Sequence, residues 1–170
     1  MKIRYAVLLF LLAFLCQGTI LNLFAIKGAT PNLILCLVST YSFLYEDNKG
    51  IALGVVFGLL SDLCMGQYLG VAAMGYLLVG LGVSFLRIMI NKENIASIII
   101  VTICSTLGYN LIYYLISVFF FGSIYSFMYW MKIQPLFIIE NIVVVLILYI
   151  QLMKRIVKYR SDRYLIWKKY

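Results

Sequence analysis

Long apolar segments alternate with short polar turns along the whole 170-residue chain. A stretch of about 20 apolar residues crosses a bilayer as a helix, and the chain has room for six such stretches. They lie at residues 5–24, 31–45, 50–65, 71–90, 95–121 and 135–153. The predicted fold class is therefore all-α, with six transmembrane helices in one compact bundle over residues 1–153 and a tail at 154–170.

Turn residues set several of these limits. Thr30 and Pro31 predict a helix start, since a capping hydroxyl is followed by proline at the first helical position. Residues 91–94 form a polar turn. The stretch 122–134 is the longest loop in this prediction, and its aromatic residues favour the membrane interface.

The composition supports a membrane location. Apolar residues make up 65% of the chain and charged residues only 12%, whereas a soluble domain has about 25% charged residues. The first apolar segment is too long for a signal peptide and no A-x-A cleavage site follows it, so we interpret it as an uncleaved span.

Basic residues are distributed unequally between the two sides of the predicted bundle. One side collects Lys2, Arg4, Lys49, Arg87, Lys92 and the seven basic residues after Met153. The other side holds only Lys27 and Lys132. Basic residues concentrate on the cytoplasmic side of membrane proteins, so both termini are predicted to be cytoplasmic.

The tail carries the densest positive charge of the chain, which has a net charge of +8. Such a cluster attracts anionic lipid head groups by about 1 kcal/mol per basic residue, which makes lipid a simpler partner than nucleic acid. Docking of a cytoplasmic protein is the alternative. The residues that we assign to this lipid-surface tail are Lys154, Arg155, Lys158, Arg160 and Arg163.

Glycines are concentrated between residues 50 and 82, where eight of the twelve lie. Steps of four residues bring successive glycines and one carboxylate onto a single stripe of a helix. Small residues at such spacing favour close helix contact in membranes, either within the chain or with a partner helix. The predicted helix-packing or partner-contact residues are Gly54, Gly58, Asp62, Gly66 and Gly70.

Asp62 is the sharpest candidate for a functional side chain. A carboxylate deep in a span costs roughly 2.5–3.5 kcal/mol on insertion scales, so it indicates a partner-binding or proton-linked site. The alternative is structural: a carboxylate near the end of its helix that reaches the outer interface, or that caps the turn at Gly66.

A second polar pair, Glu140 and Asn141, falls at a similar predicted depth, so we hypothesise that these residues converge with Asp62. The alternative places Glu140 at the membrane surface. Amides elsewhere in the spans, which more often join helices than bind ligands, complete a possible polar interior. They are Gln17, Asn22, Asn32 and Asn110.

No catalytic or metal-binding set emerges from the sequence. The chain has no histidine, and its four cysteines lie singly within apolar segments. There is also no nucleophile–base arrangement and no phosphate-binding loop followed by lysine. We therefore predict a protein that is not an enzyme and that needs neither cofactor nor metal.

The glycine-rich region resembles one known family. The motifs are Pro31-Asn32-Leu33, then Gly54-x-x-x-Gly58-Leu59-Leu60-x-Asp62-Leu63, then Gly66-x-x-x-Gly70, and finally Tyr76 and Gly80. They resemble the rod shape-determining protein MreD family. Chain length, six apolar segments, short loops and a basic C-terminus fit as well.

This resemblance implies a multi-pass protein of the bacterial cytoplasmic membrane that acts as a scaffold in the elongasome. Its expected partners are the single-span protein MreC and, through it, MreB filaments and the peptidoglycan synthesis pair RodA and a class B penicillin-binding protein. The family's fold is similar to the substrate-binding subunits of energy-coupling-factor transporters. A vitamin-binding transporter subunit is therefore the alternative, although the first helix lacks the small-residue ladder of those subunits.

Overall fold

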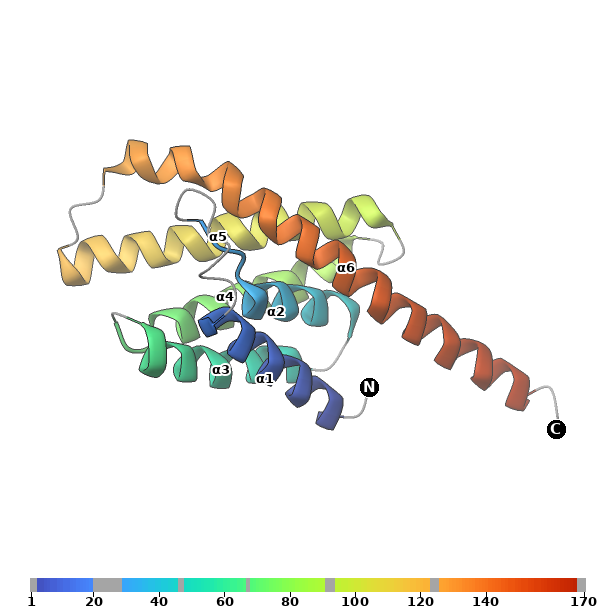
Figure 1. The fold of residues 1–170 in the computed structure, drawn as a ribbon. Helices are drawn as coiled ribbons and strands as arrows, with labels where there is room; N and C mark the ends of the chain where they lie inside the picture. The colour runs from blue at the N-terminus through green and yellow to red at the C-terminus, as the bar shows by residue number, and fades with distance from the viewer. Residues whose placement is uncertain are drawn as a thin grey trace.

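The computed structural model describes residues 3–19, 29–45, 48–66, 68–90, 94–122 and 126–167, with side-chain detail in the last helix as far as Leu152. These residues form six helices (Figure 1), which agrees with the predicted all-α class. They are α1 (Ile3–Thr19), α2 (Leu33–Leu44), α3 (Lys49–Met65), α4 (Val71–Met89), α5 (Ile95–Phe121) and α6 (Phe127–Trp167).

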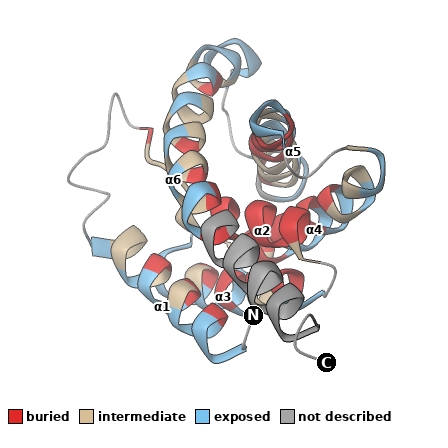
Figure 2. Cartoon of the chain, turned by 90° about the vertical axis from the view of Figure 1, so that its right-hand side faces the viewer, coloured by how far each residue is buried: buried red, intermediate tan, exposed pale blue. Residues whose placement is uncertain are grey.

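The short helix α2 lies at the centre of the bundle (Figure 2). Every residue from Ile34 to Leu44 is buried, and α2 packs against all five other helices. The remaining contacts join α1 to α3 and connect consecutive helices from α3 onward. Within the described residues, α3 and α6 share no backbone contact.

Three of the helices are long and apolar enough to cross a membrane: the segments Val71–Met89, Ile95–Phe120 and Phe127–Leu152. Helices α1 and α2 are apolar but shorter. Large apolar side chains such as Phe119 and Phe120 point outward, with about four-fifths of their surface exposed. An apolar exterior around a packed interior suits a protein that is solvated by lipid.

The predicted limits of the third, fourth and fifth helices agree with the structure to within a residue. The described part of the first helix runs from Ile3 to Thr19, and its predicted continuation to residue 24 lies outside the described residues. The predicted loop at 122–134 and the predicted helix start at Pro135 are wrong, because α6 begins at Phe127 and continues through the proline.

Aromatic packing explains the early start of α6. The Tyr114 ring of α5 lies 6.0 Å from the ring of Phe127 and 5.6 Å from that of Trp130, so the first turns of α6 have a partner. Pro135 lacks only one backbone donor, and its side chain is exposed. Figure 1 shows α6 bending near its N-terminal end and then extending past the other helices.

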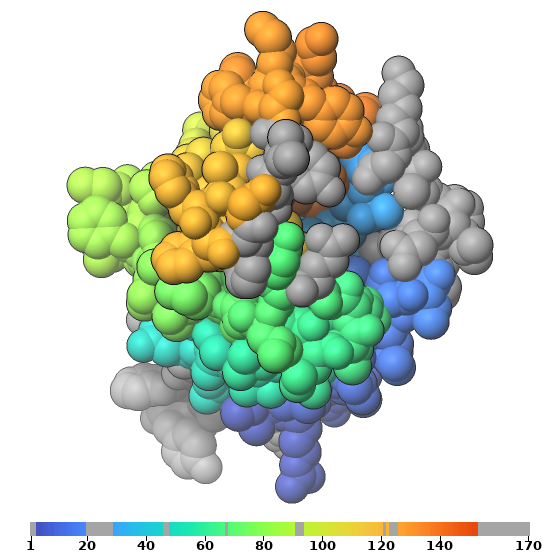
Figure 3. Space-filling view, turned by 90° about the vertical axis from the view of Figure 1, so that its left-hand side faces the viewer, coloured from blue at the N-terminus to red at the C-terminus, as the bar shows by residue number. Residues whose placement is uncertain are grey.

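One end of the bundle gathers the α3–α4 turn, the C-terminal end of α5 and the start of α6. Figure 3 shows these segments, in green, yellow and orange, sharing one face of the molecule. This is the end to which Asp62 belongs, since it lies in the last turn of α3.

Candidate functional site

The N-terminus of α2 is held by side chains from three segments of the chain. Asn32 caps its own helix, since its Oδ1 accepts a hydrogen bond from the N–H of Leu35 at 3.0 Å. The Oε1 of Gln17 on α1 accepts one from the N–H of Ile34 at 3.3 Å. The first turn of a helix has no internal acceptors, so these bonds satisfy donors that would otherwise be buried unpaired.

Asn141 joins α2, α5 and α6 at this end. Its Oδ1 accepts a hydrogen bond from the backbone N–H of Asn32 at 2.9 Å, and its Nδ2 donates to the hydroxyl of Thr106 on α5 at 3.1 Å. The Cys36 thiol also lies 3.5 Å from the Asn141 Oδ1. Only 1% of Asn141 is exposed, so this side chain is an internal connector between helices.

Tyr76 brings α4 into the same cluster. Its hydroxyl donates to the Oδ1 of Asn32 at 2.9 Å, and its ring stacks on that of Tyr109 of α5 with centroids 4.9 Å apart. Asn32 is thus bonded to residues of α2, α4 and α6. We name Gln17, Asn32, Tyr76, Thr106 and Asn141 the α2 cap cluster.

Arg87 of α4 forms hydrogen bonds with the C-terminal end of α2. Its guanidinium donates to the carbonyl oxygens of Ser42 and Tyr45, at 3.3 Å for Ser42. The last carbonyls of a helix lack internal donors and carry partial negative charge, so a cation there is favourable. Arg87 therefore completes the C-terminal end of α2.

Asp62 of α3 caps the N-terminus of α4. One carboxylate oxygen accepts from the N–H of Ala72 at 3.0 Å and of Ala73 at 3.3 Å, and the other lies 3.2 Å from the Ala72 nitrogen. Gly70, the residue at the N-cap position of α4, has no side chain to offer. The carboxylate comes instead from α3, and it is 5% exposed. It caps the first turn of α4 rather than the turn at Gly66.

The glycine stripe of α3 packs against helices of the same chain. A Cβ added at Gly58 would lie 2.8 Å from the Ala73 Cα and 2.8 Å from a ring carbon of Tyr76, both on α4. At Gly54 it would lie 2.4 Å from a methyl of Val38 on α2. Both positions therefore permit close helix contact within the bundle, the alternative that the sequence left open beside a partner helix.

Gly66 and Gly70 act in the turn rather than in helix packing. Gly66 ends α3, and a Cβ there would meet the backbone of Asp62 at 2.7 Å. Gly70 has φ +85°, a left-handed conformation that other L residues rarely adopt. These two glycines make possible the tight return that places Asp62 under α4.

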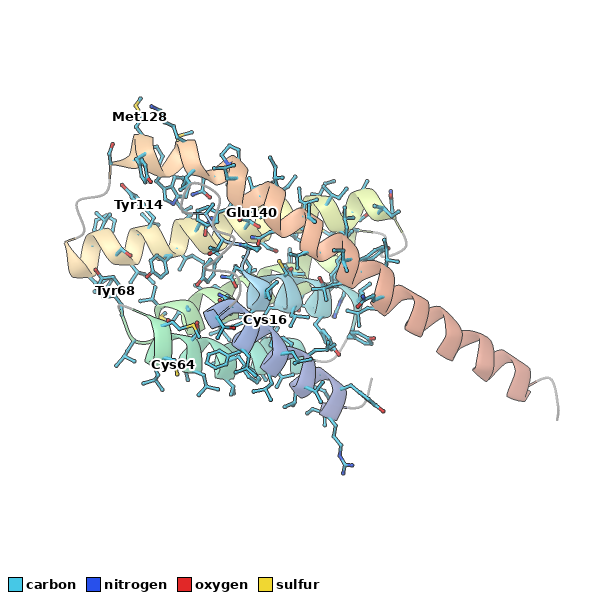
Figure 4. The ribbon with its side chains drawn as sticks, in the orientation of Figure 1. Cys16, Cys64, Tyr68, Tyr114, Met128 and Glu140 are labelled. Carbon is cyan, nitrogen blue, oxygen red and sulfur yellow. The ribbon has the colours of Figure 1, made fainter. Side chains whose placement is uncertain are left out.

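Glu140 lies apart from Asp62. It is thirteen residues after Phe127 and twelve before Leu152, near the middle of the apolar part of α6 (Figure 4). Both of its carboxylate oxygens are shielded, and neither has a hydrogen-bond partner. The carboxylate of Asp62 is bonded to α4, and α3 does not contact α6. The hypothesis that the two carboxylates converge is wrong.

Asn110 forms a separate polar pair. Its Nδ2 donates to the Oε1 of Gln134 at 2.8 Å, and the Nε2 of Gln134 donates to the Trp130 carbonyl at 3.3 Å. This pair joins α5 to the first turns of α6. It lies on the same face of α6 as Asn141, which is seven residues further along the helix.

The sequence profile of the family described as rod shape-determining protein MreD matches residues 2–158. The chain belongs to the MreD family. No curated protein and no solved structure matches it. Membership of the MreD family implies a role in determining rod cell shape, and it gives no support to a vitamin-binding transporter subunit.

The residues that suggested MreD membership have a shared structural role. Asn32, Asp62 and Tyr76 all make hydrogen bonds that attach one helix end to another helix. Their arrangement holds helices in register, and it brings no nucleophile near a base. Within the described residues, no three side chains of His, Cys, Asp or Glu gather in a group that could hold a metal ion.

Two sets of predicted residues fall outside the described part of this MreD protein. Asn22 is one, and the other is the side chains of Lys154, Arg155, Lys158, Arg160 and Arg163, whose backbone continues α6. Sequence reasoning missed Arg87 and the donor role of Tyr76. No local signal could identify the role of Arg87, since its acceptors lie 45 and 42 residues away in the sequence.

Proposed function

We propose that this protein is a non-enzymatic membrane scaffold of the bacterial cell-elongation machinery. In this proposal, six helices span the cytoplasmic membrane with both termini in the cytoplasm. The bundle binds the transmembrane helix of MreC and thereby helps couple MreB filaments to peptidoglycan synthesis by RodA and a class B penicillin-binding protein.

The match of the MreD family to residues 2–158 carries the proposal. The excess of basic residues on one side of the chain supports the orientation. The six helices and the apolar exterior support the spanning arrangement.

The α2 cap cluster supports a scaffold rather than a carrier. Its polar groups are bonded to one another and to helix ends, so they stabilise one arrangement of the bundle. A membrane carrier needs polar groups that are free to meet its cargo. Among the described polar side chains of the interior, the exceptions without a hydrogen-bond partner are the hydroxyls of Ser42 and Ser105 and the carboxylate of Glu140.

The partner question can be tested by purifying the tagged protein from its native membrane in a mild detergent and identifying the proteins that accompany it by mass spectrometry. We expect MreC together with cell-wall synthesis proteins. Recovery of a pair of ATPases with a coupling membrane subunit, and no MreC, would contradict the scaffold proposal.

A further inference from the structure

A groove opens between α4 and α5 on the outside of the bundle. Its volume is about 200 Å³, and it is lined by residues of α4 between Leu78 and Leu86 and residues of α5 between Cys104 and Ile112. Both stretches lie well inside apolar segments that are long enough to cross a membrane. The groove therefore faces the hydrocarbon layer, and its occupant comes from within the membrane.

Two glycines keep the groove open. A Cβ added at Gly82 would meet no atom within 4 Å, and one added at Gly108 would meet only a Val79 methyl at 3.9 Å. The same two helices are in close contact elsewhere, since a Cβ at Gly75 would lie 2.8 Å from the Tyr109 ring. The space at Gly82 is thus a local feature of α4 and α5, and among the described residues no side chain lies within 4 Å of a Cβ placed there.

Ser105 lines the groove with an unused polar group. It is only 3% exposed, and its hydroxyl has no hydrogen-bond partner. Other hydroxyls of α5 are paired: Thr102 donates to the carbonyl four residues earlier at 2.7 Å, and Ser117 does the same at 2.7 Å. A buried hydroxyl without a partner is unfavourable, and a ligand that supplies one gains from it.

The size of the groove indicates what enters it. An apolar cavity of about 150 Å³ holds a benzene molecule, so about 200 Å³ accommodates one large apolar side chain. A lipid acyl chain offers no hydrogen-bonding group and would leave Ser105 unpaired. A helix offers both a bulky side chain and nearby polar groups, and glycines let its backbone approach closely.

We propose that the α4–α5 groove is the docking site for a single transmembrane helix of a partner protein. The partner helix inserts one large apolar side chain beside Gly82 and places a hydrogen-bonding side chain against the Ser105 hydroxyl. This inference rests on the proposed scaffold function and names the surface at which MreC is bound.

Filling the groove tests the site. A Cβ at Gly82 meets no atom within 4 Å, so we expect Gly82→Phe to extend into the groove and to leave insertion and thermal stability as in the wild type. Leu81→Phe is the matched control, because Leu81 is half exposed and lies outside the groove. Co-purification of full-length MreC should fall at least ~10-fold in Gly82→Phe, equivalent to about 1.4 kcal/mol, and should persist in Leu81→Phe.

Ser105→Ala separates docking from folding. Its hydroxyl bonds nothing in the free protein, so thermal stability should not decrease. Affinity for MreC should fall by about threefold, the usual effect of one interhelical hydrogen bond in a membrane. A loss of stability equal to the loss of binding would overturn the role of Ser105.

A photoreactive residue in place of Leu78, at the rim of the groove, identifies the occupant directly. An adduct with MreC supports the proposal, whereas adducts with lipid alone overturn it. Equal recovery of MreC by wild type and Gly82→Phe overturns the groove while the scaffold function stands. Failure of the wild type to recover MreC refutes the proposed function, and the docking site with it.

Discussion

Substitution of Asp62 tests whether its carboxylate stabilises the position of α4. In the structure its carboxylate accepts hydrogen bonds from the N–H groups of Ala72 and Ala73, both of which are 5% exposed. Asp62→Leu removes every acceptor. Asp62→Asn keeps one side-chain oxygen, and a single oxygen already reaches both donors, at 3.0 Å and 3.3 Å.

The two variants should differ in magnitude. A buried donor without a partner costs about 1–3 kcal/mol, so Asp62→Leu should lower the free energy of unfolding by about 2–6 kcal/mol. Asp62→Asn loses mainly the attraction between the negative charge and the helix N-terminus, which is about 0.3–2 kcal/mol. We therefore expect Asn to be mild and Leu severe.

Thermal unfolding of the purified variants in detergent provides the assay. Leu63→Ala serves as the control, because Leu63 is adjacent in sequence and 67% exposed, and exposed substitutions usually change stability by less than about 0.5 kcal/mol. If Asn destabilises the protein as much as Leu does, the charge is what matters and the hydrogen-bond explanation is refuted. A Leu variant as stable as the wild type would show that Asp62 does not hold α4.

Two further predictions concern contacts between helices. Gly58→Ala should be less stable than Gly82→Ala by about 1–3 kcal/mol in thermal unfolding, because only the Cβ at Gly58 collides with backbone atoms of Ala73. Equal stability of the two variants would argue against the close α3–α4 contact. Arg87→Leu should destabilise the protein by about 1–3 kcal/mol, whereas Arg87→Lys should destabilise it less because lysine keeps a charged donor. Identical unfolding temperatures for the two variants would exclude a role for the charge at the end of α2.

The α3–α4 contact also changes what a larger substitution at Gly58 can report. If the glycine stripe were free to receive a partner helix, Gly58→Leu would block that contact. In the structure a single added carbon at Gly58 already meets the α4 backbone at 2.8 Å. Loss of MreC binding in Gly58→Leu would thus follow from a disturbed bundle, so Gly82 is the more informative position.

Much of the fold was predictable because hydropathy and turn residues act locally. The polar residues around 46–49 and 91–94 separate apolar segments, and the structure begins α3 and α5 at Lys49 and Ile95. The aromatic stretch before residue 135 was predicted to be an interfacial loop. In the structure α6 begins at Phe127, because ring contacts with Tyr114 on another helix pack its first turns.

The central place of α2 was not predictable from its pattern. In a soluble protein, a helix that is apolar on all sides must be buried, but in a membrane protein the lipid hides this signal. The role of Arg87 was equally hidden, since its acceptors Ser42 and Tyr45 lie 45 and 42 residues away in the sequence. Asp62 was recognised as unusual, and its partner followed only from the return of the chain at Gly70.

The capping of α2 has a consequence for how the protein is made. Twelve residues give a helix about 18 Å long, which is shorter than the hydrocarbon layer of about 30 Å. Its ends are completed by Arg87 and Asn141, which are synthesised 43 and 97 residues after Leu44. A chain truncated before the last helix would therefore lack the Asn141 acceptor for the N–H of Asn32, and α2 would be incompletely capped at the centre of the bundle.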